Sequence, residues 1–186
     1  MPKFTKNEDS FAFDWLKQNG WKGPSQKIVC LHVRDSEYLN NFFPGFNWDY
    51  QAVRDANIYD FTDTINWLIK KDIFVIRTGK VAKSKLKIKS QFLVDYPFCK
   101  TQNDLLDIWL MANSDLVIST ATGFPESSYA YKVPIIYVNY MPLGQAHSWK
   151  KSLAIGKHLI WEESNKHLNL SDYIKVHDFF KVQDYK

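Results

Sequence analysis

Short apolar runs alternate with helix-like segments along most of this chain, and this alternation constrains the fold more than any other feature. Apolar, β-branched runs predict buried strands at residues 27–33, 73–77, 92–95, 115–119 and 134–139. Amphipathic spacing predicts intervening helices at residues 60–69, 103–112 and 125–132. Such strands are typical of a parallel sheet covered on both faces. We therefore predict an α/β fold, a Rossmann-like three-layer domain with a mostly parallel sheet.

The helix and domain boundaries follow from capping and turn residues. Asp60 and Asn103 are the expected N-caps of the first two helices. Residues 1–26 are polar and interrupted by glycine and proline, so we expect a lead-in segment with one short helix around 11–18, followed by a single domain over 27–186. Residues 35–58 are expected to form a loop, and 186 residues suffice for one full domain but not comfortably for two.

Composition and missing motifs exclude several classes of protein. A net charge of +4 suits a protein that handles phosphates and is far from a nucleic-acid-binding tail. Cys30 and Cys99 are too few for a disulfide framework, and without a signal peptide or spanning run we expect reduced thiols in a cytoplasmic protein. Dinucleotide and P-loop motifs are absent, and no histidines have ligand spacing, so neither a cofactor nor a metal is expected.

Polar residues follow the first predicted strand, at the edge where parallel sheets bind ligands. His32 and Arg34 are two residues apart on a strand and share one face, while Asp35 comes next. A buried histidine and arginine need partners, and a phosphate would be one. The alternative is structural: a satisfied core histidine and an Arg34–Asp35 surface pair.

Three further groups of residues are candidates for ligand contact. Ser119, Thr120, Thr122 and Gly123 lie between a strand and a helix, where free amides attract anions. Glu126 and Ser127 follow and could meet a ribose or sugar hydroxyl, although plain N-capping explains this turn too. Arg77 and Lys80 end the second strand, with a structural ion pair as the alternative.

Two surface patterns have a structural and a functional interpretation. Lysines at 83, 85, 87 and 89 share one face of an extended segment, which protects an edge strand or contacts an acidic lipid surface or anionic acceptor. Five rings around a Pro-Gly turn either pack onto the domain or form a dimer contact, namely Phe42, Phe43, Phe46, Trp48 and Tyr50. Residues 140–151 suit stacking and phosphate contacts or a purely structural loop.

Several segments, taken in order, resemble a family of bacterial glycosyltransferases often encoded with surface-polysaccharide genes. The segments are LHVRDSEYL (31–39), VRDANI (53–58), VIRTGK (75–80), DLLDIWLMANSDLVISTATG (104–123), PIIYVNYMPLG (134–144) and SWKKSLAIGKHLIW (148–161). The H-x-R segment also resembles the donor-phosphate motif of the fucosyltransferase-like group, which has the GT-B architecture of two facing Rossmann-like halves.

The resemblance implies that this chain is the C-terminal, donor-binding half of a metal-independent GT-B glycosyltransferase. Such an enzyme transfers a sugar from a nucleotide-sugar to the hydroxyl of a glycan or lipid-linked acceptor, in surface-polysaccharide or glycoconjugate synthesis. Arg34 then matches the arginine on the donor pyrophosphate, with His32 beside it. Residues 119–123 and Glu126 match the nucleotide-facing helix start, and Asp35 is the nearest candidate for a general base.

Family members are longer than this chain, which has only 26 residues before its first predicted strand. We therefore expect the acceptor half to be missing, supplied by another chain, or replaced by a homodimer contact. The alternative functions are a non-catalytic module that binds a nucleotide-sugar or phosphate, and a truncated fragment. The expected location is the cytoplasm, with peripheral contact at the inner face of the membrane as a further option.

Overall fold

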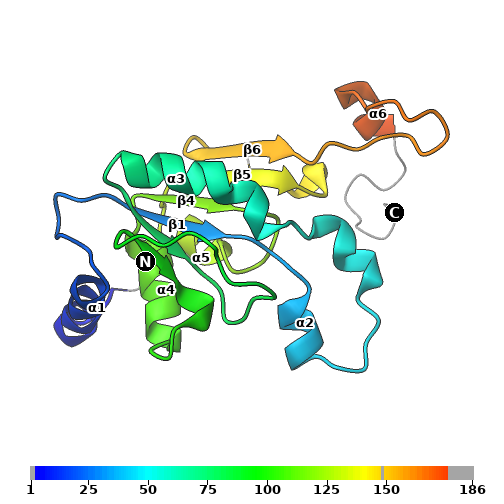
Figure 1. The fold of residues 1–186 in the computed structure, drawn as a ribbon. Helices are drawn as coiled ribbons and strands as arrows, with labels where there is room; N and C mark the ends of the chain where they lie inside the picture. The colour runs from blue at the N-terminus through cyan, green and yellow to red at the C-terminus, as the bar shows by residue number, and fades with distance from the viewer. Residues whose placement is uncertain (1–2, 148, 176–186) are drawn as a thin grey trace.

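The computed structural model describes residues 3–147 and 149–175, which form a six-stranded sheet between two layers of helices (Figure 1). The strands are β1 (Ile28–His32), β2 (Phe74–Arg77), β3 (Leu93–Asp95), β4 (Leu116–Ser119), β5 (Ile135–Tyr140) and β6 (Ser152–Gly156). Their order is β3-β2-β1-β4-β5-β6, and all five pairings are parallel. The predicted fold class is confirmed. The chain order reverses between β1 and β4, which makes this the switch point of the sheet.

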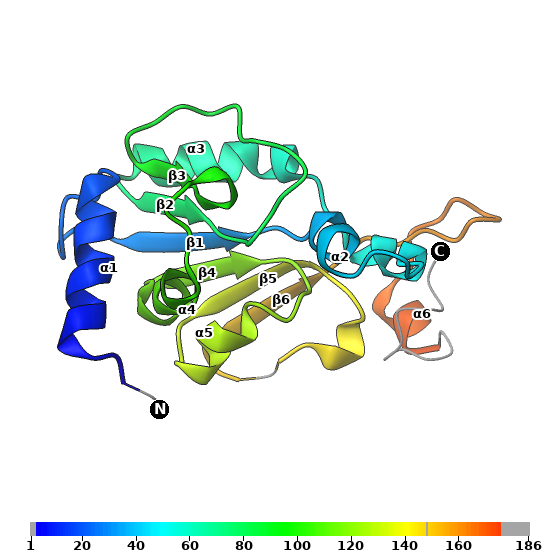
Figure 2. The same cartoon turned by 90° about the horizontal axis from the view of Figure 1, so that it is seen from below.

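Helices cover both faces of the sheet, as Figure 2 shows. Their bounds are α1 (Lys6–Gln18), α2 (Glu37–Phe42), α3 (Thr62–Lys70), α4 (Asp104–Asn113), α5 (Glu126–Ala130) and α6 (Leu170–Lys175). One face is covered by α1, α4 and α5, whose core centres on Leu16 and Trp109. The other face is covered by α3 and a preceding 3₁₀ turn, through Phe61 and Ile65.

The N-terminal segment packs into the main core. Helix α1 is longer than the predicted helix because Thr5 and Glu8 form a capping box at its start. Trp15 is buried in the cluster that covers the β1 face, and its indole Nε1 donates to Thr101 Oγ1 at 2.9 Å. The Trp109 indole of α4 in turn donates to Asp9 Oδ1 at 2.8 Å. Residues 1–26 therefore contribute to the same core as residues 27–175 where the structure describes both.

The helix caps test two sequence predictions. The Asn103 cap is confirmed, since its Oδ1 accepts from the Leu106 amide at 2.9 Å. The Asp60 cap is wrong: a 3₁₀ turn over Ile58–Phe61 comes first, and α3 begins at Thr62. The Thr62 hydroxyl donates to the Tyr59 carbonyl at 2.6 Å, so this turn joins the helix without a carboxylate cap.

Three elements lie where no helix or strand was predicted. Helix α2 occupies part of the expected loop 35–58, β6 extends the sheet beyond β5, and α6 follows it. Strand β6 lies at the edge of the sheet, with Leu153 57% and Ile155 50% accessible, and its apolar run, residues 153–155, is only three residues long. Within the described residues, no helix combines the length and the hydropathy needed to cross a bilayer.

Candidate functional site

A cavity of about 590 Å³ opens at the carboxyl ends of β1, β2 and β4, beside the switch point of the sheet. Its walls come from the residues that follow these three strands, from α2 and from the start of α4. Six of the predicted site residues line it: His32, Arg34, Asp35, Lys80, Thr122 and Gly123. The sequence therefore predicted the location of the cavity from the strand ends alone.

Arg34 is the charged group at the end of β1. Its Nε donates to Asp55 Oδ1 at 3.0 Å, and the side chain is only 11% exposed. Its Nη2 is buried and has no hydrogen-bond partner among the described residues. Arg54 supplies a second guanidinium. Burial and then the positive charge of Arg34 lower the pKa of Arg54. An unpaired buried donor costs free energy, so this arrangement favours an anion.

His32 lies deeper in the same cavity. Its Nδ1 is 3.3 Å from the Thr78 hydroxyl, and its ring lies 5.0 Å from the ring of Phe124. Burial lowers the pKa of His32 to about 4 because desolvation disfavours the imidazolium. Its imidazole is therefore neutral at pH 7 and can exchange hydrogen bonds with a ligand without adding a charge.

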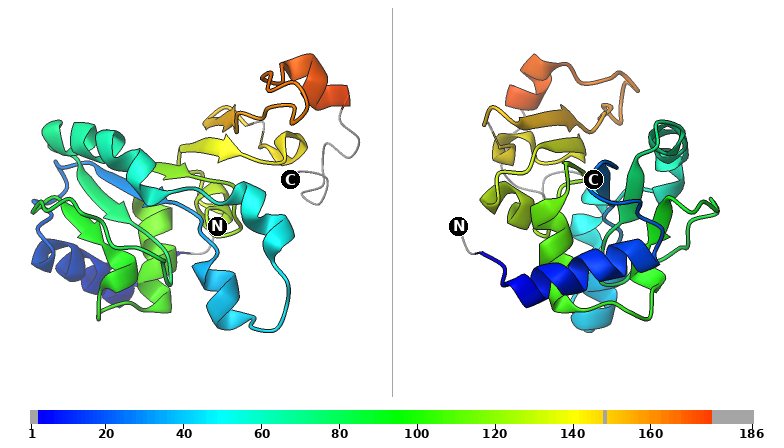
Figure 3. Two further views of the ribbon diagram at one scale, coloured as in Figure 1. Left: turned by 45° about the vertical axis from the view of Figure 1, so that its right-hand side comes forward. Right: turned by 90° about the vertical axis from the view of Figure 1, so that its left-hand side faces the viewer.

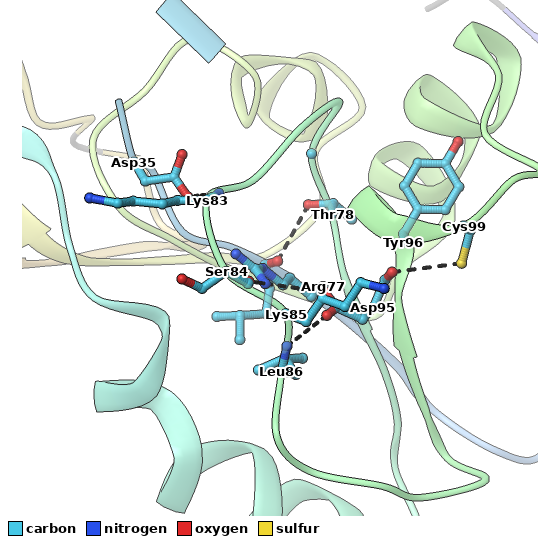
Figure 4. Close-up of polar contacts among 12 residues, drawn as sticks. Asp35, Arg77, Thr78, Lys83, Ser84, Lys85, Leu86, Asp95, Tyr96 and Cys99 are labelled. Carbon is cyan, nitrogen blue, oxygen red and sulfur yellow. Dashed lines mark hydrogen bonds and ion pairs between the residues drawn. The ribbon is translucent and has the colours of Figure 1, made fainter. Parts of the chain in front are cut away.

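Asp35 lines the cavity, but both of its carboxylate oxygens are already occupied. Oδ1 accepts from the Glu37 amide and Oδ2 from the Lys83 amide, each at 3.0 Å. The side chain thus links the turn before α2 to the segment after β2. Figure 4 shows Asp35 beside Lys83. This is the geometry of a residue that positions two loops.

Arg77 lies elsewhere than predicted, behind the cavity and outside its lining. Its Nη1 donates to the Ser84 carbonyl at 2.6 Å and to Asp95 Oδ1 at 3.2 Å (Figure 4). The side chain is 1% exposed. Asp95 Oδ2 also accepts from the Leu86 amide at 2.8 Å. This is the structural ion pair, and it holds the segment after β2 against the sheet.

The strand-to-helix segment after β4 also divides into two parts. Ser119 and Thr120 are fully buried, and Thr120 Oγ1 accepts from the Arg34 amide at 2.8 Å. They shape the backbone at the switch point and do not line the cavity, whereas Thr122 and Gly123 do. Ser127 caps locally, its hydroxyl donating to the Phe124 carbonyl at 2.9 Å.

Glu126 points toward the loop after β5 and not into the cavity lining. Its carboxylate contacts His147 Nε2 at 2.8 and 3.0 Å, and the Tyr137 hydroxyl at 3.5 Å. The ring of Tyr129 stacks on His147 at 4.5 Å between centroids. In this structure the predicted contact of Glu126 with a sugar hydroxyl is replaced by contacts within the protein.

Lys80 and two carboxylates form a second polar group in the cavity lining. Lys80 Nζ lies 2.6 Å from Asp104 Oδ1 and 3.9 Å from Asp107 Oδ2. Asp107 Oδ1 is buried without a hydrogen-bond partner among the described residues, and burial raises the pKa of this carboxyl. Sequence analysis did not identify Asp107 as a candidate. Its position near the start of the helix capped by Asn103, which lies at the cavity, could have indicated it.

The lysine-rich segment behaves as its period-two pattern predicts. The lysines at 83, 85, 87 and 89 are exposed, while Leu86 and Ile88 pack against the core that α3 covers. The segment forms no strand, so the predicted protection of an edge strand is wrong here. Lys87 Nζ lies 4.7 Å above the ring of Tyr59.

No protein-family model and no curated protein matches this chain. Among solved structures, the ADP-heptose LPS heptosyltransferase II of E. coli matches with a TM-score of 0.52 and 13% sequence identity. The match covers 88% of this chain and 46% of the heptosyltransferase, so the chain spans about half the length of that protein. The likeness shows the fold alone: a Rossmann-like α/β domain similar to about half of that glycosyltransferase.

Proposed function

We propose that this domain binds the diphosphate of a nucleotide-sugar at the carboxyl end of β1 and supplies the donor site of a glycosyltransferase. The observation that carries the proposal is Arg34, which lines the cavity and whose buried Nη2 has no hydrogen-bond partner among the described residues. A guanidinium can donate two parallel hydrogen bonds to phosphate oxygens. The GT-B-like fold and the position at the switch point support the same reading.

In the proposed reaction, an acceptor hydroxyl attacks the anomeric carbon of the donor sugar. The bond from that carbon to the diphosphate oxygen breaks, and the leaving nucleoside diphosphate takes the electron pair. Arg34 stabilises the charge that develops on this group, in the role a metal ion fills elsewhere. The hydroxyl proton goes to a base. Asp107 is better placed than Asp35 for this step, because backbone amides occupy both Asp35 oxygens.

The proposal is tested by calorimetric titration of UDP, ADP, GDP and CDP, each with and without EDTA. We expect one of them to bind, with an affinity that EDTA leaves unchanged. Arg34→Gln should weaken this binding at least tenfold. The affinity of Arg34→Lys should lie between those of the natural chain and Arg34→Gln, since lysine keeps the charge but loses the planar fork. Lys71→Gln is the control, because it removes one positive charge at the end of α3, before β2.

Three results would count against the proposed donor site. They are no binding by any of the four nucleotides, equal losses in Arg34→Gln and Lys71→Gln, and binding that requires Mg²⁺ or Mn²⁺.

A non-catalytic binding module is the second candidate function. The structural match supports it as well as it supports an enzyme, because the match shows the fold of one domain and not transfer. Transfer in a two-half architecture needs a second wall to exclude water and orient the acceptor. Nucleotide-sugar binding without hydrolysis or transfer, in the presence of crude polysaccharide acceptor, would support the module. Multiple turnovers by the isolated chain would support the enzyme.

A further inference from the structure

An exposed group of aromatic rings extends from the cavity along α2 and the turn that follows it. We call it the aromatic platform, and it consists of Tyr38, Phe42, Phe43, Phe46, Trp48 and Tyr50. Neighbouring rings contact one another, with centroids 4.8 Å apart for Tyr38–Phe42, 5.7 Å for Phe46–Trp48 and 6.2 Å for Trp48–Tyr50. Phe46 is 70% exposed and Phe42 48%.

The platform packs on itself and is part of none of the core clusters. Figure 3 shows α2 and the following turn standing away from the sheet. Its shape is nevertheless fixed, because the Trp48 indole donates to the Phe43 carbonyl at 3.1 Å and the Asp49 amide donates to Asn47 Oδ1 at 2.8 Å. An ordered apolar patch of this kind marks an interaction site.

The platform is continuous with the proposed donor site. Tyr38 and Phe42 belong to the platform and also line the cavity, together with Leu39 between them. A molecule lying across the rings therefore reaches the cavity that holds Arg34 and Asp107. This is where the second substrate of a transfer reaction has to be.

The charge pattern of the platform selects the chemical class of its occupant. Residues 38–48 contain no charged side chain, and the flanking residues Glu37 and Asp49 are acidic. An anionic lipid or nucleic acid would be repelled there. The polar groups among the rings are the amides of Asn40, Asn41 and Asn47. Asn41 Nδ2 donates to Glu37 and Asn47 Oδ1 accepts from the Asp49 amide, so Asn41 Oδ1, Asn47 Nδ2 and the Asn40 amide are the groups that can pair with hydroxyls. A pyranose ring offers a C–H face for an aromatic ring and hydroxyls for amides.

We propose that the aromatic platform is an acceptor subsite that binds a neutral oligosaccharide. The inference rests on the proposed function for its role in transfer, but saccharide binding can be measured separately from nucleotide binding. The rings supply contact area on the C–H faces of successive sugar units, and the cavity receives the unit whose hydroxyl reacts.

The test is saturation-transfer NMR on the full chain with cellohexaose, maltohexaose and chitohexaose. We expect at least one to bind, with transfer strongest to its ring C–H protons. The double variant Phe43→Ala/Phe46→Ala should weaken that binding at least tenfold, because it removes two rings that lie outside the cavity lining. Trp67→Ala is the matched control, since Trp67 is an exposed ring on α3, 58% accessible, and its loss should change nothing.

Nucleotide titration and light scattering on the same proteins separate the outcomes. The double variant should keep the nucleotide affinity of the natural chain and its molecular mass. Saccharide binding without nucleotide binding would support the platform as a saccharide site and would overturn the proposed donor site. Nucleotide binding without binding of any hexasaccharide would overturn the platform as an acceptor subsite. A dimer that the double variant disrupts, again without saccharide binding, would assign the surface to a second copy of the chain.

Discussion

The ends of β1 and β2 invite comparison because each places an arginine at the same edge of the sheet. Arg34 follows β1 and lines the cavity, with Nε on Asp55 and Nη2 unpartnered. Arg77 ends β2 and is 1% exposed, with Nη1 shared between Ser84 and Asp95. The two residues have the same chemistry and similar sequence contexts. Arg34 keeps one buried nitrogen without a hydrogen-bond partner beside the cavity, whereas Arg77 pairs within the protein.

The difference arises in the segments that follow the two strands. After β2 the chain turns back at Gly79, where φ is +139°, and its residues 84–86 cover Arg77. After β1 the chain leaves the sheet through α2, and no group in the described structure accepts a hydrogen bond from the buried Nη2 of Arg34. The two arginines therefore differ in the segments that follow their strands: the segment after β2 folds back over Arg77, whereas the segment after β1 continues into α2.

The largest effect that would test this comparison is on stability at Arg77. Arg77→Ala leaves the Ser84 carbonyl without its donor and Asp95 without its charge partner. Removing one member of a buried pair costs about 3–5 kcal/mol, and we expect a loss of that size in the free energy of unfolding measured with urea. Arg34→Ala should cost less. An unchanged midpoint for Arg77→Ala would remove the structural half of the comparison.

The pH dependence of stability at His32 comes next. The pKa of His32 is about 4 when folded, against about 6.5 for a free histidine, and desolvation is the main cause. Between these values the unfolded chain binds a proton that the folded chain does not. Stability from this group is complete above pH 6.5 and falls as the pH drops toward 4, by up to about 3 kcal/mol.

The measurement is urea unfolding at pH 7.5, 5.5 and 4 for the natural chain and for His32→Gln. The carboxylates titrate alike in both proteins, so the difference between the two profiles reports His32. Parallel profiles would show that the imidazole is not desolvated as the structure places it.

A smaller stability effect, joined to a binding effect, is expected for Arg34→Ala. The lost hydrogen bond to Asp55 joins two charged groups and is worth about 1.5–3 kcal/mol. Nucleotide affinity should fall at least tenfold in the protein that remains folded, as calorimetry would show. If Arg34→Ala loses stability and keeps its nucleotide affinity, the two arginines have the same structural role.

The smallest effect is expected for Lys80→Gln. Lys80 lines the cavity, but its partner Asp104 is 91% exposed, so solvent screens the pair. We expect an unchanged urea midpoint and a loss of nucleotide affinity of a few fold. A loss as large as that of Arg34→Ala would move the centre of the anion site from Arg34 to Lys80.

The sheet was predictable from the sequence because its inner strands are buried on both faces. Continuous apolar runs such as residues 27–33 and 73–77 leave few other arrangements, and their ends locate the ligand edge. The Asn103 cap was also predictable, because an N-cap depends on a local pattern of a few residues. Strand β6 was missed because its apolar run, residues 153–155 between Ser152 and Gly156, is only three residues long.

The roles of individual site residues depended on contacts between distant parts of the sequence. Asp95 lies 18 residues after Arg77, and Asp55 lies 21 residues after Arg34. No local pattern distinguishes these two pairs. Glu126 similarly faces His147 of a later loop. The start of α1 was missed for a different reason, because the sequence analysis did not use the local Thr5–Glu8 capping-box pattern.

The strand order also has a consequence for how the chain folds during synthesis. The central strand β1 pairs with β2 on one side and with β4 on the other, and Val29 lies opposite Leu116. Until β4 leaves the ribosome, one edge of β1 has no partner, and Trp109 of α4 is not yet present to cover α1. Non-local parallel pairing of this kind folds slowly. The nascent chain therefore exposes one edge of its central strand until residues 116–119 have been made, and this is the interval in which a chaperone would matter most.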